Sequence, residues 1–131
     1  MTYFTAEQKD RVELLARALE SGKYEQTNGL LRQDGPNGWQ YCCLGVACDL
    51  YHEKTERGQW DSDTFLAGGG TQSSSTELVE EVREWYGFLD MNPALVVKDG
   101  TPDENHDRAA GLNDGGWSFE EIAQGLRKLI A

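Results

Sequence analysis

The chain has 131 residues, a common size for one domain and too few for two ordinary ones. It carries 12 basic and 23 acidic residues, a net charge of −11, which argues against direct binding to nucleic acids or to anionic membrane surfaces. No apolar run approaches the length of a membrane span, and no secretory leader pattern opens the chain. We therefore expect a soluble, cytoplasmic protein that is not membrane-bound.

The acidic charge is concentrated in the middle of the chain. Residues 49–90 contain ten acidic and three basic side chains. A field of this sign favours solubility and association with a basic partner. We therefore expect this segment to carry the functional surface.

Helices are predicted at both ends of the chain, over about 6–21 and 119–130, because apolar residues recur there at helical spacing. Each predicted helix starts with a capping-box pattern, in which a hydroxyl and a longer polar side chain three residues on satisfy free backbone N–H groups. The pairs are Thr5 with Gln8, and Ser118 with Glu121.

The middle of the chain has weaker signals. They predict a hairpin with arms at Leu30–Leu31 and Trp39–Cys42, followed by a buried helix at 43–52. A long surface loop is expected at about 53–75, and a helix at 76–86 that starts with a Ser74–Glu77 capping box. A short strand at 94–97 and a helical turn at 108–112 follow. Together these elements predict a single α+β domain over 1–131. Three to four helices would pack on a short antiparallel hairpin or small sheet.

The three cysteines cluster at Cys42, Cys43 and Cys48. In a helix, Cys48 and His52 would stand four residues apart on one face, and thiolates and imidazoles are good zinc ligands. However, Cys43 and Cys48 are five residues apart, no Cys-x-x-Cys is present, and free cysteines are commonly core residues. We predict a core role with no metal and no cofactor. A metal site of Cys43, Cys48 and His52, or an enzyme site that also uses Cys42, stays open as the alternative.

Two segments resemble a known group of proteins. The first segment consists of residues 18–26, Leu31-Arg32, and Tyr-Cys-Cys-Leu-Gly-Val-Ala-Cys-Asp-Leu at 41–50. The second consists of Leu-Asn-Asp at 112–114 and Ser-Phe-Glu-Glu-Ile-Ala at 118–123. They resemble small proteins of bacteriophages and actinobacteria that have no assigned activity. The resemblance implies a phage-encoded protein.

Polar and aromatic residues beside these motifs suggest a binding site. Tyr24, Gln26 and Arg32 are not explained by packing, and Tyr41 belongs to a set of rings suited to stacking on a ligand. We predict that these four residues bind a ligand.

No catalytic motif is visible, so we expect a non-enzymatic protein that engages or inhibits a host protein through an acidic surface. The alternatives are sequestration of a nucleotide-like ligand and a small Cys/His metal protein or enzyme. The oligomeric state is left open.

Overall fold

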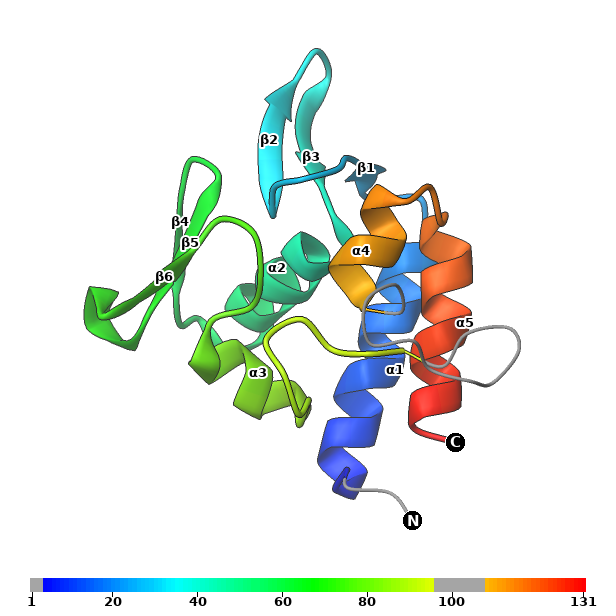
Figure 1. Cartoon of the computed structure of the whole chain (residues 1–131). Coiled ribbons are helices and arrows are strands. Elements are labelled where there is room, and N and C mark those ends of the chain that lie inside the picture. The colour runs from blue at the N-terminus through cyan, green and yellow to red at the C-terminus, as the bar shows by residue number, and fades with distance from the viewer. Residues whose placement is uncertain (1–3, 96–107) are drawn as a thin grey trace.

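The computed structural model describes residues 4–95 and 108–131, and over these ranges it has five α-helices and two three-stranded sheets in one α+β domain (Figure 1). The predicted fold class is therefore confirmed. The helices are α1 Ala6–Glu20, α2 Cys43–Thr55, α3 Glu80–Tyr86, α4 Ala109–Asp114 and α5 Phe119–Leu129. The strands are β1 Glu25–Gln26, β2 Arg32–Gly35, β3 Gly38–Tyr41, β4 Gln59–Asp61, β5 Thr64–Ala67 and β6 Gln72–Ser74, with a 3₁₀ turn at Gly68–Gly70.

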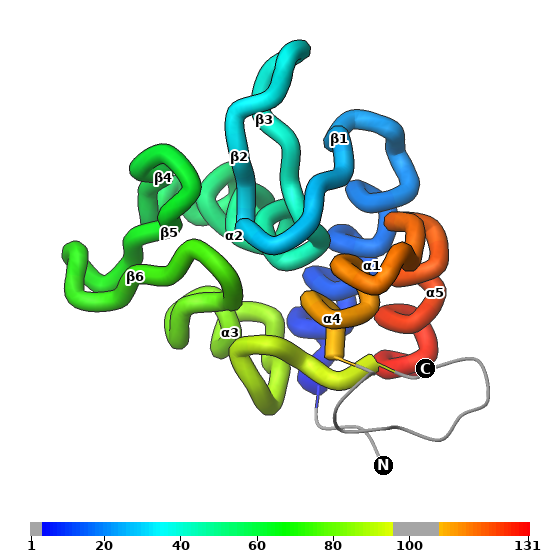
Figure 2. The backbone as a smooth tube through the Cα atoms, turned by 45° about the horizontal axis from the view of Figure 1, so that its top comes forward, coloured from blue at the N-terminus to red at the C-terminus, as the bar shows by residue number. Residues whose placement is uncertain are grey.

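The first and last helices lie side by side although they are at opposite ends of the chain (Figure 1, Figure 2). Both predicted capping boxes are present: the Thr5 hydroxyl accepts the Gln8 N–H at 3.1 Å, and the Ser118 hydroxyl accepts the Glu121 N–H at 3.2 Å. At the edge of the pair, Arg127 donates to the carboxylate of Glu20 at 2.6 and 2.7 Å. Such a two-bond pairing fixes how the two helices sit against each other.

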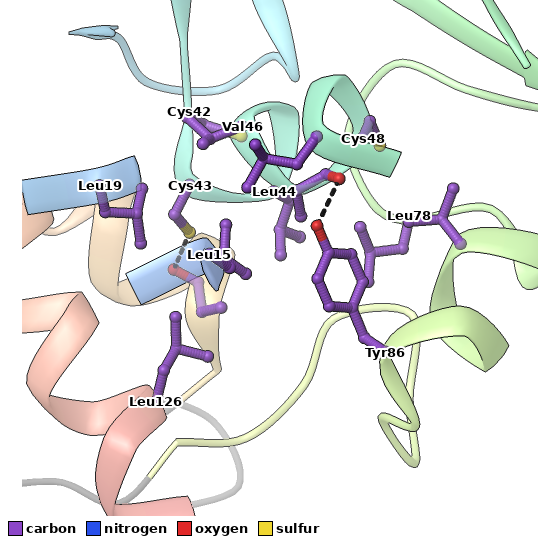
Figure 3. Packing of buried hydrophobic residues seen from close by; sticks show 14 of the residues in the cluster. Leu15, Leu19, Cys42, Cys43, Leu44, Val46, Cys48, Leu78, Tyr86 and Leu126 are labelled. Atoms are coloured by element: carbon purple, nitrogen blue, oxygen red, sulfur yellow. Dashed lines mark hydrogen bonds between the residues drawn. The ribbon is translucent and has the colours of Figure 1, made fainter. Parts of the chain in front are cut away.

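The central helix α2 is buried along most of its length and begins where predicted, although it continues to Thr55. Cys42, Cys43 and Cys48 are all buried in the hydrophobic core, and Figure 3 shows the side chain of Cys43 beside Leu15 and Leu19 of α1. In the first turn of the helix, Gly45 passes against the backbone of Leu31. A Cβ atom added to Gly45 would stand 1.7 Å from the Leu31 carbonyl oxygen, so only glycine fits.

A buried amide joins these helices to the first sheet. Asn113, on α4, is 1% exposed. Its Nδ2 donates to the carbonyl of Thr27 at 2.7 Å, and its Oδ1 accepts from Gln26 Nε2 at 2.9 Å and from the backbone N–H of Cys43 at 3.2 Å. The last bond supplies a cap to α2, whose own N-cap residue Cys42 makes no side-chain capping hydrogen bond.

A hairpin is present, but its first arm is not where it was predicted: β2 begins at Arg32, after Leu30–Leu31, and lies mostly in the expected loop, while β3 ends at Tyr41, one residue before the predicted end. β2 and β3 pair antiparallel from Arg32 opposite Tyr41 to Gly35 opposite Gly38, which leaves only Pro36 and Asn37 in the turn. The turn closes because Gly38 adopts a positive φ of 118°. β1 adds to β3 in parallel, and the hairpin projects from the body of the domain (Figure 2).

The predicted loop at 53–75 is wrong. After α2 ends at Thr55, β4, β5 and β6 form an antiparallel sheet beside α2 and α3 (Figure 1). Phe65 and Ala67 are buried and alternate with partly exposed neighbours, which is the pattern of a half-buried strand. The glycines that suggested a loop form the turn between β5 and β6 instead.

Three smaller expectations need correction or fall partly outside the structure. α3 starts at Glu80, not at 76, because the Ser74 hydroxyl accepts the N–H groups of Thr76 and Glu77 in a turn before the helix. Of the strand expected at 94–97, Ala94 makes an isolated bridge with Arg108, while residues 96 and 97 lie outside the described ranges. The helical turn expected at 108–112 is confirmed as α4.

Replacing Gly45 by alanine should lower the free energy of unfolding by about 3 kcal/mol, because the new methyl group forces α2 away from Leu31. Gly111→Ala is the matched control, since it lies in a helix with nothing within 4 Å and should leave stability unchanged or raise it by up to about 1 kcal/mol. Urea unfolding measures both. Equal unfolding midpoints for the two variants would contradict the close approach.

Asn113→Ala should lower the free energy of unfolding by about 2 kcal/mol or more, because it leaves the Cys43 N–H and the Thr27 carbonyl without their partner. Asn37→Ala, in the exposed hairpin turn, should change it by less than about 0.5 kcal/mol. Thermal and urea unfolding of both variants test the difference. A variant at 113 as stable as the variant at 37 would show that the amide does not hold the fold.

Candidate functional site

Polar and aromatic side chains gather where the hairpin meets the β4–β6 sheet. They come from the segment before β1, from β2, β3 and β4, and from the middle of α2, and each touches another through ring or hydrogen-bond contacts. We call them the aromatic–arginine cluster: Tyr24, Arg32, Trp39, Tyr41, Asp49 and Trp60.

The guanidinium of Arg32 is the centre of the cluster. Its Cζ atom lies 3.8 Å from the centre of the Trp39 ring and 4.4 Å from that of Trp60, so the cation contacts two tryptophans. Its Nε donates to the carbonyl of Ser62 at 2.7 Å, which ties the hairpin to the second sheet. Within the described ranges no carboxylate lies in salt-bridge distance of this guanidinium.

The carboxylate of Asp49 hydrogen-bonds two of the aromatic residues. One carboxylate oxygen accepts the hydroxyl of Tyr24 at 2.7 Å, and the other accepts the indole N–H of Trp60 at 3.1 Å. Burial, and then this hydrogen bond to Asp49, raise the pKa of Tyr24 far above its usual range, so its hydroxyl remains a donor. The ring of Tyr41 packs edge-on against both Tyr24, at 5.0 Å, and Trp60, at 6.1 Å.

The outer part of the cluster is open to solvent and is flanked by acidic groups. Trp39 is 40% exposed, which is unusual for so large a ring. Its cross-strand neighbour Asp34 is exposed, as is Asp61, which follows Trp60 on β4. The surface therefore presents indole faces and one cation inside an acidic rim.

Three of the four residues predicted as a site come together, and one does not. Tyr24, Arg32 and Tyr41 belong to the cluster, whereas Gln26 donates to Asn113 and to the Trp117 carbonyl at 2.8 Å and helps to hold the fold. The sequence reasoning missed Asp49. Its only signal was a carboxylate within an otherwise apolar run, and its partners are set by folding.

The cysteine alternative gains no support from the described residues. Burial raises the pKa of Cys42 to about 11 and those of Cys43 and Cys48 well above their ordinary value, so all three favour the unreactive thiol form. His52 is partly exposed, and its Nδ1 lies 3.0 Å from the Arg57 carbonyl oxygen. Among the described residues, no three His, Cys, Asp or Glu side chains are grouped to hold a metal ion.

The chain belongs to the protein family described as Domain of unknown function (DUF8296), whose sequence profile matches residues 8–129. The matched range includes both segments of the sequence motif and every residue of the aromatic–arginine cluster. No curated protein and no solved structure matches the chain. In the part of the chain that the structure describes, no helix is long and apolar enough to cross a membrane.

At pH 8 the buried thiols should react with a disulfide reagent at least about a hundredfold more slowly than a free thiol does. In denaturant all three thiols should react fully. Because the pKa of Cys42 is raised in the folded chain from its ordinary 9.0 to about 11, unfolded thiols ionise first. Stability should therefore be complete below pH 9 and fall between pH 9 and 11.

The control for this pH dependence is Cys42→Ala, which should make the alkaline loss of stability shallower. Denaturant titrations at pH 8, 9, 10 and 11 measure it in both proteins. One thiol that reacts in the native protein as fast as a free thiol would instead indicate an activated nucleophile and revive the enzyme alternative.

Proposed function

We propose that this chain is a non-enzymatic, phage-encoded binding protein that engages a host protein in the host cytoplasm through the aromatic–arginine cluster and its acidic rim. The observation that carries the proposal is the guanidinium of Arg32, held between two tryptophans of which Trp39 is 40% exposed. The partner is a protein with a basic, partly apolar face.

The residue types of the cluster support a protein interface. Tryptophan, tyrosine and arginine are the side chains that most often carry the binding energy of protein–protein contacts. Here they are already held in place: Ser62 and the two indoles fix Arg32, and Asp49 fixes Trp60. A surface fixed in this way loses little side-chain entropy when a partner docks.

The polar groups of the cluster support binding rather than acid–base chemistry. Both oxygens of Asp49 accept hydrogen bonds from neighbours within the cluster. The hydroxyl of Tyr24 is committed to that carboxylate, and the Nε of Arg32 to a backbone carbonyl. These contacts leave the exposed ring of Trp39 as the main surface available to a partner.

The charge supports a basic partner. Residues 49–90 carry ten acidic and three basic groups, and the exposed Asp34 and Asp61 flank the indoles. Such a field accelerates the approach of a basic surface and repels phosphates. A nucleotide-like ligand could stack on Trp39, but its phosphates would meet this acidic rim, so we place it second.

Trp39→Ala should weaken binding to the partner about 30-fold, which corresponds to about 2 kcal/mol, because it removes an exposed anchor ring. The immobilised chain and the variant are presented to actinobacterial lysate, and any stoichiometric partner is then purified and titrated by calorimetry. Its binding should also weaken as salt is raised.

Leu89→Ala is the matched control, because Leu89 is an exposed apolar side chain, 75% accessible, outside the cluster. It should bind the partner like the unchanged protein. A partner retained equally by the Trp39 variant would contradict the proposal, as would a lysate that yields only weak binders lost at moderate salt. Competition by a nucleotide at micromolar concentration would favour the small-ligand alternative.

A further inference from the structure

A second surface feature lies between α2 and α3, apart from the aromatic–arginine cluster. It is a pocket of about 500 Å³, a size within the range of ligand sites. Its walls are formed by Tyr51, Thr55, Arg57, Glu81, Glu84 and Trp85. The pocket therefore combines two aromatic rings with two carboxylates and one guanidinium.

The rings of the pocket are rigidly placed. Tyr51 and Trp85 meet edge to face with their centres 5.5 Å apart. The hydroxyl of Tyr51 donates to the carboxylate of Glu81. Outside the pocket lining, the Arg11 guanidinium lies 4.6 Å from the centre of the Trp85 ring and donates to the Trp85 carbonyl at 2.8 Å. The indole therefore already binds one cation of this chain.

The carboxylates give the pocket its charge. Glu81 and Glu84 stand three residues apart on α3, so both face the same side of the helix. The side chain of Glu84 is 65% exposed, and its ion-pair partner in the described ranges, Arg83, is 3.6 Å away. Among the lining residues Arg57 offsets one of these two negative charges, while Arg83, outside the lining, is shared between Glu84 and its closer partner Glu80.

We infer that this pocket receives a lysine or arginine side chain of a partner protein, with its apolar stem against the half-buried ring of Trp85 and its charge beside Glu81 and Glu84. Long basic side chains suit such a site, because they bury their methylene groups against rings and keep the cation near carboxylates. This inference rests on the proposed function and adds a second contact point for the basic partner.

Ring contacts connect the pocket to the aromatic–arginine cluster. Trp60 packs against Phe65 at 5.0 Å, Phe65 against Tyr51 at 6.3 Å, and Tyr51 against Trp85. Phe65 is fully buried, so this series of rings passes through the core. The two surfaces therefore share one packed support.

A lysine–serine repeat peptide is the probe, and the indole N–H resonances of the full-length protein are the readout. The peptide should shift the Trp85 signal saturably and leave the Trp117 signal unchanged. The double variant Glu81→Gln, Glu84→Gln should bind it about tenfold more weakly, because it keeps the acceptor for Tyr51 and removes both charges. A glutamate–serine peptide should not bind.

The double variant Asp10→Asn, Glu120→Gln is the control, because it makes the same change in net charge at two exposed positions outside the pocket. It should bind the peptide within twofold of the unchanged protein. Equal weakening in both double variants would overturn the inference in favour of general charge attraction, and so would an unshifted Trp85 signal. If the peptide does not bind, this inference is wrong, but capture of the partner through Trp39 is not affected. If the partner is not captured through Trp39, the proposed function is wrong, and peptide binding still tests the pocket separately.

Discussion

The structure depends first on one buried amide. Asn113 satisfies the start of α2 and the carbonyl of Thr27 at once, although it lies 70 residues after Cys43 and 86 residues after Thr27 in the chain. An unpaired polar group in that position would cost more than the hydrogen bonds gain, so the arrangement has little tolerance. Because α2 is placed in this way, Asp49 on its second turn lies where it can hold Tyr24 and Trp60. The surface that we propose as functional therefore follows from the scaffold.

The same dependence explains how much of the fold could be predicted from the sequence. The ends of the chain were predicted well, because a capping box such as Ser118 with Glu121 acts within one turn and needs no distant partner. The segment at 53–75 was predicted badly, because its strands are three or four residues long and are stable only when Phe65 packs in the core. Glycine and serine signalled a loop there, and the chain uses them in the turns of a sheet. The predicted hydrogen bond from the Glu77 N–H to the Ser74 hydroxyl is present, but it closes a turn before α3 and does not cap a helix.

The candidate site was predictable to a similar extent. Tyr24 and Arg32 attracted attention as polar side chains without an obvious packing role, and folding brings both into one cluster. Gln26 had the same appearance in the sequence, but its amide faces the scaffold and meets Asn113. The difference is one of direction, because Tyr24 lies just before β1 and turns to Asp49 of α2, whereas Gln26 is the last residue of β1 and turns to Asn113 of α4. No local pattern can settle such a direction before the register of β1 against β3 is known.

Charge and rings have different parts in a surface of this kind. The acidic field of residues 49–90 acts over a Debye length and governs how often a basic partner arrives. The indoles act only in contact and govern how long it stays, because losing a buried anchor chiefly raises the rate of dissociation. Arg32 adds one positive charge beside a segment that has seven more acidic than basic groups, and its guanidinium packs on Trp39 and Trp60 without losing that charge. The cluster can thus serve as an anchor without cancelling the field that brings a basic partner to it.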